Sequence, residues 1–336
     1  MTPHDPSSRR LALGAVVALV ALAAVPVPLL AAGDATVFTV SDPEKDDHGD
    51  GNLRYPVRSR NDMLPGHLDL VSFAATRETG GTTFEVTFAR PVVRTEKVPV
   101  DDTGTLMTDV MRLGFYTFNV DVYVDTDRVP GSGNVGMLPG RNAEVDPAFA
   151  WEKAVCLTPL PGPAETVLRR SLTRQARKEA PAGVGDRAAR ESGKAALKGE
   201  VARQITDSVF FPTRVEIRGR RVRFFVPDAF LGAAASADWA YVVAVSGADV
   251  AGRLDLGRLA GLKPDAGPEP LFIMRAAPGR SGDAFGGADE DDPAPCPFVD
   301  LLVPPGTTQE KVLSSFDPSS GRLVRLPAVV PAARAK

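Results

Sequence analysis

The chain has 336 residues, of which 43% are hydrophobic, and a formal net charge of −3. That length is enough for one large domain or two small ones, each with a full core. Because no basic excess is present to neutralise a phosphate backbone, we expect no nucleic-acid partner.

The first 35 residues have the order of an export signal. Arg9 and Arg10 precede an apolar run over residues 11–32, and small residues follow. This order predicts a signal peptide that is cleaved after Ala32 or Ala35. The apolar run is also long enough to span a bilayer, so an uncleaved membrane anchor is the alternative. In either case we expect an exported protein, in the periplasm, at the cell surface or outside the cell.

An acidic loop, "SDPEKDDHGDGNLRYP" at residues 41–56, opens the exported chain. Four carboxylates fall within nine positions, those of Asp42, Asp46, Asp47 and Asp50. Calcium takes about six to eight oxygen ligands, and a loop broken by glycines can fold such groups around one ion. The loop is not an EF-hand, because no glutamate occupies the twelfth position counted from Asp46. Two interpretations stay open, a calcium site and a solvated acidic turn.

Two-residue periodicity predicts antiparallel strands after this loop. In "FNVDVYVDTD", three valines alternate with polar residues and a tyrosine, which is typical of a strand with one buried face. Further β runs follow in "TRVEIRG", "RVRFFVP", "WAYVVAVSG" and "LFIMRA", and a glycine between the first two predicts a hairpin. We predict a mainly β fold, an antiparallel β-sandwich over residues 36–326, with a flexible tail at 327–336.

A charged segment at about residues 164–208 interrupts the strands. It lacks aromatic residues over most of its length, favours helix and contains a break at "PAGVG", so it predicts an inserted pair of helices. A basic cluster lies in its first half: Arg169, Arg170, Arg174, Arg177 and Lys178. This cluster is either a solvated helix face or a contact for an acidic envelope polymer or an anionic membrane surface.

No motif in the sequence predicts catalysis. "GSGNVG" at residues 131–136 matches a dinucleotide fingerprint, but two prolines in the following "MLPGRNAEVDP" exclude the helix that this fingerprint has to open. Only His48 and His67 follow the export segment, and no H-E-x-x-H, C-x-x-C or G-x-S-x-G spacing occurs. We therefore predict a protein that is not an enzyme.

Three other features have two interpretations each. Cys156 and Cys296 could form a long-range disulfide or remain free thiols. A second acidic run, "GGADEDDPAPC" at residues 286–296, is either a surface loop or a place where a cation is needed. Sugar-binding sites generally use aromatic platforms, and core packing is the alternative role for the tryptophans. The candidate platforms are Trp151, Trp239, Tyr116 and Tyr123.

Several of these stretches together resemble the C-terminal, non-catalytic module of glucodextranases and related exported glucan hydrolases. "DPEKDDHGDGNLRYP" is similar to the family's opening segment, although Lys45 replaces its usual glycine and Leu53 its first tyrosine. "HLDLVSF", "LPGRNAEV", "WEKAV", "FFVPDAFLG", "FGGADEDDPAPCPFVDLL" and "TQEKVLSSF" follow in family order. The resemblance covers roughly residues 38–317.

The resemblance implies a DOMON-like β-sandwich that favours calcium and binds carbohydrate or a cell-envelope component. It adds Asp69 to the candidate metal ligands of the opening loop. The alternative function is a structural envelope protein that assembles with itself or with other surface proteins, and a glucan hydrolase is a third possibility.

Overall fold

The computed structural model describes most of the chain after the predicted export segment. The described residues are 35–57, 62–99, 103–179, 187–248, 271–279, 284–290, 295–317 and 320–331. All of them belong to one compact unit, Asp34–Lys336. The predicted signal or anchor at residues 11–32 lies outside the described residues.

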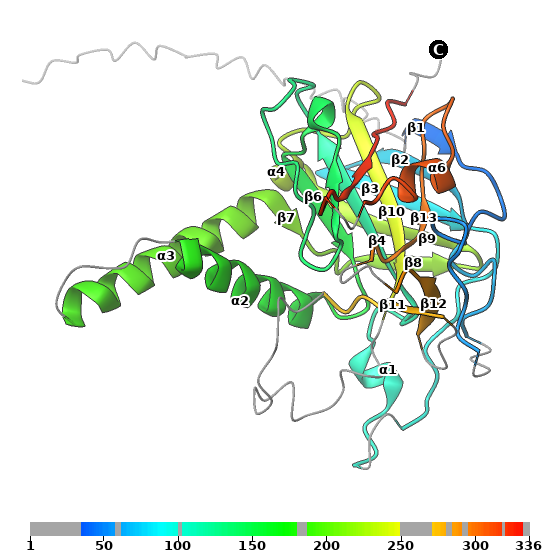
Figure 1. Ribbon diagram of the computed structural model, residues 1–336, viewed down its shortest axis with the longest axis horizontal. Helices are drawn as coiled ribbons and strands as arrows, with labels where there is room; N and C mark the ends of the chain where they lie inside the picture. Colours follow the sequence, from blue (N-terminus) through cyan, green and yellow to red (C-terminus); the bar gives the residue numbers. More distant parts are fainter. Residues whose placement is uncertain are drawn as a thin grey trace, which may run out of the picture. The chain divides into compact units, whose positions relative to one another are not determined.

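The first sheet of the sandwich contains five antiparallel strands (Figure 1). Their order across the sheet is β1 (Ala35–Ser41), β2 (Leu70–Glu78), β3 (Gly81–Phe88), β9 (Arg221–Pro227) and β8 (Val215–Arg218). The predicted hairpin is confirmed, since β8 pairs with β9 around a turn in which Gly219 has φ +60°.

The second sheet also contains five strands. Their order is β13 (Phe298–Leu301), β10 (Ala240–Gly247), β4 (Phe118–Asp125), β6 (Lys153–Leu157) and β7 (Val209–Phe210). All neighbours are antiparallel except β6 and β7, which are parallel. The mainly β prediction is confirmed.

The main core fills the space between the two sheets. Phe73 and Phe84 of the first sheet stack with ring centroids 5.4 Å apart, and both contact Tyr241 of β10. Val120, Val122 and Val124 of β4 point into the same core. The two-residue alternation of the sequence therefore correctly assigns these valines to a buried face.

The opposite face of β4 is also buried, so the prediction of a half-buried strand was wrong. Every residue of β4 is buried. A second core covers this face, and it includes Tyr123, Trp151 and Leu326. The covering layer contains the short parallel pair β5 (Ala143–Val145) and β14 (Val324–Leu326), which no periodic pattern in the sequence indicates.

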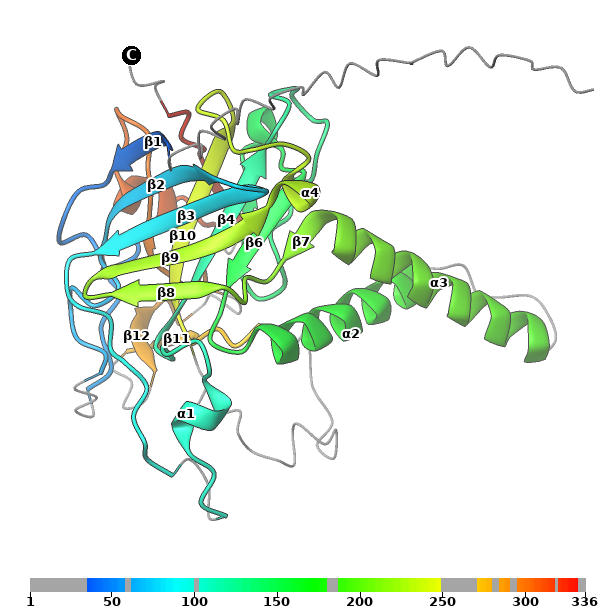
Figure 2. The same ribbon diagram turned by 180° about the vertical axis from the view of Figure 1, so that it is seen from behind.

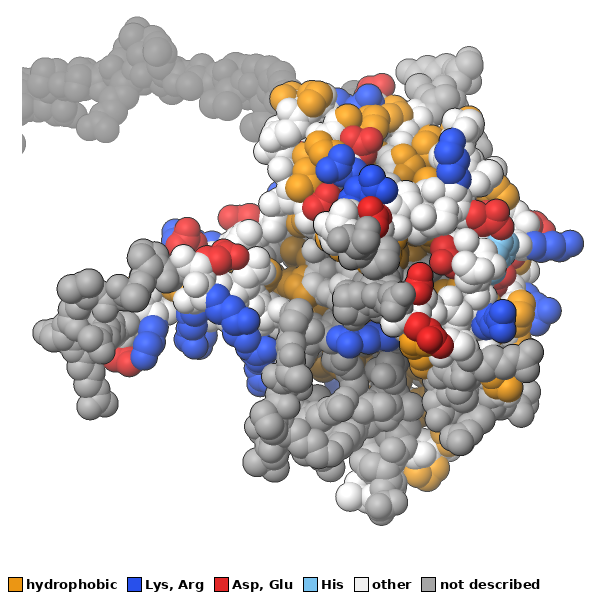
Figure 3. Space-filling view, viewed as in Figure 1, with side chains coloured by type: hydrophobic (Ala, Val, Ile, Leu, Met, Phe, Trp, Pro, Cys, Tyr) orange, Lys and Arg blue, Asp and Glu red, His pale blue; other side chains and the backbone are white. Residues whose placement is uncertain are grey.

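The predicted helical insertion is confirmed as α2 (Pro161–Glu179) and α3 (Arg187–Ser208). Leu168 of α2 and Val201 and Ile205 of α3 join the second core, while most side chains farther along the two helices are exposed. Figures 1 and 2 show the two helices extending away from the sandwich as a hairpin. Lys and Arg side chains gather along one side of it in Figure 3.

Short elements complete the described structure. They are α1 (Met107–Val110), the 3-10 helix η1 (Pro147–Phe149), α4 (Asp228–Leu231), β11 (Ala276–Pro278), β12 (Phe285–Ala288) and α6 (Gln309–Leu313). "LFIMRA", expected to be a strand, contributes only an isolated bridge between Ile273 and Ala248 before β11 begins.

The end of the domain lies beyond the predicted boundary at residue 326. Val329 is buried and exchanges both backbone hydrogen bonds with Tyr241, at 2.8 and 2.9 Å. These bonds correct the prediction of a flexible tail for residues 327–331, and residues 332–336 lie outside the described part. Cys156 and Cys296 do not form a disulfide with each other. No helix among the described residues has the length and apolarity needed to cross a membrane.

Candidate metal centre and ligand pocket

The acidic opening loop connects β1 to β2, and its backbone is hydrogen-bonded to strands of both sheets. Asp42 follows β1 directly, and its N–H donates to the carbonyl of Val71 in β2 at 2.9 Å. Farther along, Gly49 N–H donates to the carbonyl of Val299 in β13 at 3.0 Å. The loop therefore spans the ends of strands from both sheets.

Three carboxylates from distant parts of the chain meet under this loop. Oxygens of Asp42, Asp46 and Asp300 all lie within 4.8 Å of one another. Asp42 and Asp300 are buried, and Asp46 is half-buried. Two of these acids belong to the predicted ligand set, while Asp300 comes from β13 and was not among the candidates. We call the three the first acidic centre.

In the first acidic centre, several buried carboxylate oxygens have no N–H or O–H group that donates a hydrogen bond to them. Both carboxylate oxygens of Asp42 and Oδ1 of Asp46 are buried without a hydrogen-bond partner. Asp300 is better satisfied, because Oδ2 accepts from Leu70 N–H at 2.5 Å and Oδ1 from Leu301 N–H at 2.6 Å. Unpaired buried carboxylate oxygens are costly and call for a proton or a cation.

Burial and mutual repulsion raise the pKa values in this centre. Burial first, and then the charges of Asp46 and Asp69, raise the pKa of Asp42 to about 8. Burial, followed by the charges of Asp42 and Asp46, raises the pKa of Asp300 well above its usual value. Without a cation, the centre therefore favours proton uptake.

Two other predicted ligands, Asp69 and Asp47, make different contacts in the opening loop. Asp69 is buried, accepts from Lys45 N–H at 2.8 Å through Oδ2, and leaves Oδ1 without a partner. Burial is the main cause that raises the pKa of Asp69 to about 6. Asp47 closes the loop instead, because its Oδ2 accepts from the hydroxyl of Tyr55 and from Gly66 N–H at 2.6 Å.

Lys45 occupies the position where the resembled family usually has glycine, and its conformation gives the reason. Its φ is +74°, in the left-handed region that glycine adopts without strain. Its side chain is exposed, so its ammonium group is not buried beside the acids. Lys45 therefore contributes its backbone N–H, which donates to Asp69, and not the charge of its side chain.

Gln309 is a further organising residue that the sequence did not reveal. It begins α6, is buried, and donates from Nε2 to the carbonyls of Asp46 and Gly49 at 2.5 and 3.0 Å. Its Oε1 accepts from Leu301 N–H at 2.6 Å. The side-chain amide of Gln309 therefore connects the opening loop to β13. In the sequence, the only indication of this residue is its position directly after a threonine that can cap a helix.

The donor set fits a hard divalent cation such as calcium. It consists of oxygens, it carries several negative charges, and it contains buried carboxylate oxygens with no donor. Two oxygens that each bind one calcium at about 2.3–2.6 Å can be at most about 5 Å apart, which the 4.8 Å limit satisfies. The residues present therefore fit the predicted ion.

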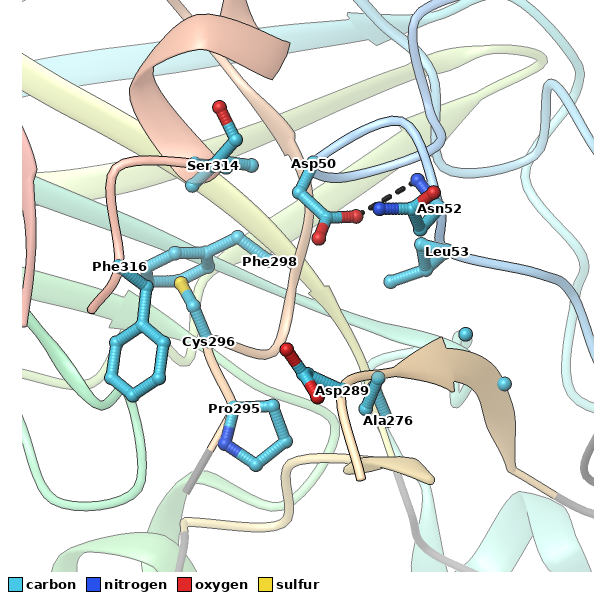
Figure 4. A pocket seen from close by; sticks show the side chains of 14 residues that line it. Asp50, Asn52, Leu53, Ala276, Asp289, Pro295, Cys296, Phe298, Ser314 and Phe316 are labelled. Carbon is cyan, nitrogen blue, oxygen red and sulfur yellow. Dashed lines mark hydrogen bonds between the residues drawn. The ribbon is translucent and has the colours of Figure 1, made fainter. Parts of the chain in front are cut away.

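A pocket of about 240 Å³ lies beside the opening loop (Figure 4). Asp50 and Asn52 line one side, and the Asp50 carboxylate accepts from Asn52 N–H at 2.9 Å. Asp289, Ser314 and Phe316 line the pocket from other segments. Asp50, predicted as a metal ligand, thus belongs to this pocket and lies outside the first acidic centre.

The two acidic runs of the sequence meet at this pocket. Arg54 and Gly286 exchange backbone hydrogen bonds at 2.8 and 2.9 Å, which joins the opening loop to β12. Gly287 packs so closely that a Cβ there would lie 2.0 Å from the carbonyl oxygen of Asn52. Residues 291–294 of the second run lie outside the described part.

The predicted aromatic platforms do not line this pocket. Trp151 and Tyr123 are 6% and 1% exposed and pack edge to face in the second core, 5.3 Å between centroids, so packing accounts for both rings. Trp239 and Tyr116 are half-buried against the first and second core. The aromatic residues at the pocket that sequence analysis missed are Phe298 and Phe316.

Comparison with known families agrees with this structure. One family model, described as the C-terminal binding-module, SLH-like, of glucodextranase, matches residues 37–328. The chain belongs to this family. The family is a binding module, and the match spans both sheets, the opening loop and the helical hairpin. Among curated proteins, none matches the chain.

Proposed function

We propose that this chain is an exported, non-catalytic module that attaches to a polysaccharide or another cell-envelope component. The family match over residues 37–328 is the observation that carries this proposal, because it describes a binding module of an enzyme that acts on glucan. The export signal predicted before residue 36 supports a location outside the cytoplasm.

The pocket beside the opening loop is the proposed binding site. The carboxylates of Asp50 and Asp289 and the amide of Asn52 line it, and such groups pair with sugar hydroxyls. Phe316 and Leu313 supply apolar lining. The walls of the pocket are more polar than apolar, which suits a ligand that carries many hydroxyl groups.

We further propose that calcium occupies the first acidic centre and stabilises the site. Asp42, Asp46 and Asp300 would hold the ion, with Asp69 close by. Bound calcium would neutralise the buried acids and fix the opening loop, whose other end forms a wall of the pocket. The ion thus has a structural role here, and no reaction step depends on it.

A pocket-filling variant tests the binding site. Ser314 is exposed at the pocket, so Ser314→Trp should block it with little effect on the fold. The matched control is Ser192→Trp, on the exposed part of α3. We expect wild type and the control to be retained on insoluble glucans or purified cell envelopes, and Ser314→Trp to be retained at least about tenfold less.

Two results would count against the proposal. Equal retention of both tryptophan variants would exclude the pocket as the site. No retention of the wild-type protein on any glucan or envelope fraction would exclude the binding function itself. Unchanged melting of Ser314→Trp would show that lost retention does not come from unfolding.

A further inference from the structure

A second group of acids lies at the far end of β4, and we call it the second acidic centre. Oxygens of Asp125, Asp127 and Glu152 lie within 4.8 Å of one another. Asp125 is the last residue of β4, Asp127 follows in the turn, and Glu152 comes just before β6. The pairing of β4 with β6 brings them together, since Glu152 N–H donates to Val124 O at 3.1 Å.

The backbone of the intervening turn orients each acid through one oxygen. The donors are Arg128 N–H to Asp125 Oδ1 at 2.6 Å, Val129 N–H to Asp127 Oδ1 at 2.8 Å, and Thr126 N–H to Glu152 Oε2 at 2.7 Å. Each carboxylate is therefore held in place while part of its acceptor capacity stays unused.

Asp125 provides the observation that points to a ligand. Its side chain is 1% exposed, and its Oδ2 is buried without any hydrogen-bond partner. A buried carboxylate oxygen without a donor, beside two other carboxylates, is costly and would be stabilised by a proton or a cation. Burial, the largest cause, raises the pKa of Asp125, although Arg128 N–H and Asp127 N–H oppose it.

The available donor and cation groups do not satisfy this demand. Ser132 Oγ lies 3.0 Å from Asp127 Oδ1 and 3.2 Å from Glu152 Oε1, and its single proton can serve only one of them. The Arg128 guanidinium donates to Asp238 O at 3.2 Å and lies over the Phe149 ring. Within the described part of the chain, no salt bridge includes any of the three acids.

We propose that the second acidic centre binds a divalent cation that prefers oxygen ligands, with calcium as the natural candidate. Asp125, Asp127 and Glu152 supply its carboxylate ligands, and the 4.8 Å separation suits oxygens that share one such ion. This inference does not rest on the proposed glycan binding or on occupancy of the first centre.

The glycine-rich segment at residues 131–136 gains a role from this proposal. It covers the second acidic centre, and Gly133 packs so closely that a Cβ there would lie 2.5 Å from Glu152 Oε1. Asn134 pairs with Trp151 through N–H···O bonds of 2.8 and 2.9 Å. The segment that matches a dinucleotide fingerprint thus closes over carboxylates, which would repel a phosphate.

The two centres are separate sites on one sheet. Asp300 pairs with Val245 of β10, and Val245 pairs on its other side with Val120 of β4. Asp125 lies five residues farther along β4, which is roughly 17 Å at about 3.4 Å per residue. One ion cannot serve both centres.

Terbium luminescence excited through tryptophan distinguishes the second centre from the first. Terbium replaces calcium at oxygen sites and emits when a nearby excited ring transfers energy. Both tryptophans of the chain are close to this centre: Trp151 precedes Glu152, and Trp239 precedes Ala240, which pairs with Asp125. We expect sensitised emission from the chelator-treated full chain, and its loss on adding excess calcium.

Matched variants assign the signal. Glu152→Gln should bind terbium at least about tenfold more weakly, whereas Asp42→Asn in the first centre should keep the emission. Emission from Glu152→Gln equal to that of wild type would overturn the proposal.

Ion counting by native mass spectrometry keeps the proposal testable if Glu152→Gln does not fold. Asp42→Asn, which leaves the second centre intact, should retain one calcium ion per chain. A calcium-free mass for Asp42→Asn in excess calcium would equally overturn the proposal.

Discussion

Buried carboxylates have different surroundings at two sites, Asp121 of β4 and the first acidic centre. Asp121 of β4 is 1% exposed, and the fully buried guanidinium of Arg141 holds both its oxygens, at 2.6 and 2.8 Å. In the first acidic centre Asp42 and Asp300 are also buried and Asp46 is half-buried. None of these three acids has a salt bridge to a basic side chain in the described residues.

The two sites differ in whether the polypeptide itself supplies a counter-charge. At Asp121 the counter-charge is part of the polypeptide. Burial lowers the pKa of Arg141, but the neighbouring charge of Asp121 contributes to a net increase, so the guanidinium stays charged. At Asp42, burial and then the charge of Asp46 raise the pKa to about 8, so a bound proton or cation would stabilise this carboxylate. We therefore expect the ion pair to be insensitive to added calcium and the first centre to be sensitive.

Removing the internal counter-charge should have the largest effect. Arg141→Leu leaves Asp121 buried and unpaired, so we expect a loss of about 3–5 kcal/mol in the free energy of unfolding, measured by urea titration. The double variant Arg141→Leu/Asp121→Leu should recover most of that loss. If Arg141→Leu alone unfolds like wild type, the ion pair is not what compensates Asp121.

The pH dependence of stability should separate the two sites next. In chelator, the folded chain holds protons on Asp42 up to pH about 8 and on Asp69 up to about 6, whereas the unfolded chain releases both near 3.8. The folded state thus binds more protons, and the free energy of unfolding should fall as pH rises from about 4 to about 8. Excess calcium should flatten this decline, because it stabilises the ionised acids. A decline that is equally steep with and without calcium would contradict this assignment.

Replacing Lys45 should have the smallest effect and tests whether a nearby lysine supplies the missing charge. Because φ at Lys45 is +74°, Lys45→Gly should raise the free energy of unfolding by about 0.5–1 kcal/mol. Lys45→Ala, which keeps the strain but loses the charge, should change little in comparison. Destabilisation by both variants would mean that the ammonium group of Lys45 compensates the acids after all.

The sequence predicted the frame of the fold better than its second layer. Two-residue alternation correctly marked the valines of β4 as core, and the glycine break marked the β8–β9 hairpin. The second core over Tyr123 and Trp151 was missed, because the short pair β5–β14 and the irregular segments around it have no periodic pattern.

The sequence also predicted only part of the candidate site, because contacts between distant segments leave no local pattern. Asp42 and Asp46 are close in sequence, so their meeting required only a turn. Asp300 reaches them because β13 lies at the edge of the second sheet, and Gln309 because α6 follows β13. Such contacts depend on strand order, which local spacing does not encode. The meeting of Asp125 with Glu152 likewise depends on the pairing of β4 with β6.

The calcium dependence of thermal unfolding tests the central claim most directly. Wild type should melt at a higher temperature in calcium than in chelator, by the equivalent of about 2.7 kcal/mol at 100 times the dissociation constant. Asp42→Asn removes an acid that has no hydrogen-bond donor, so this variant should be at least as stable as wild type in chelator. In calcium it should lose the part of the gain that comes from the first acidic centre and keep the part that comes from the second. Identical melting of wild type in calcium and in chelator would contradict the account and leave the opening loop as an acidic turn.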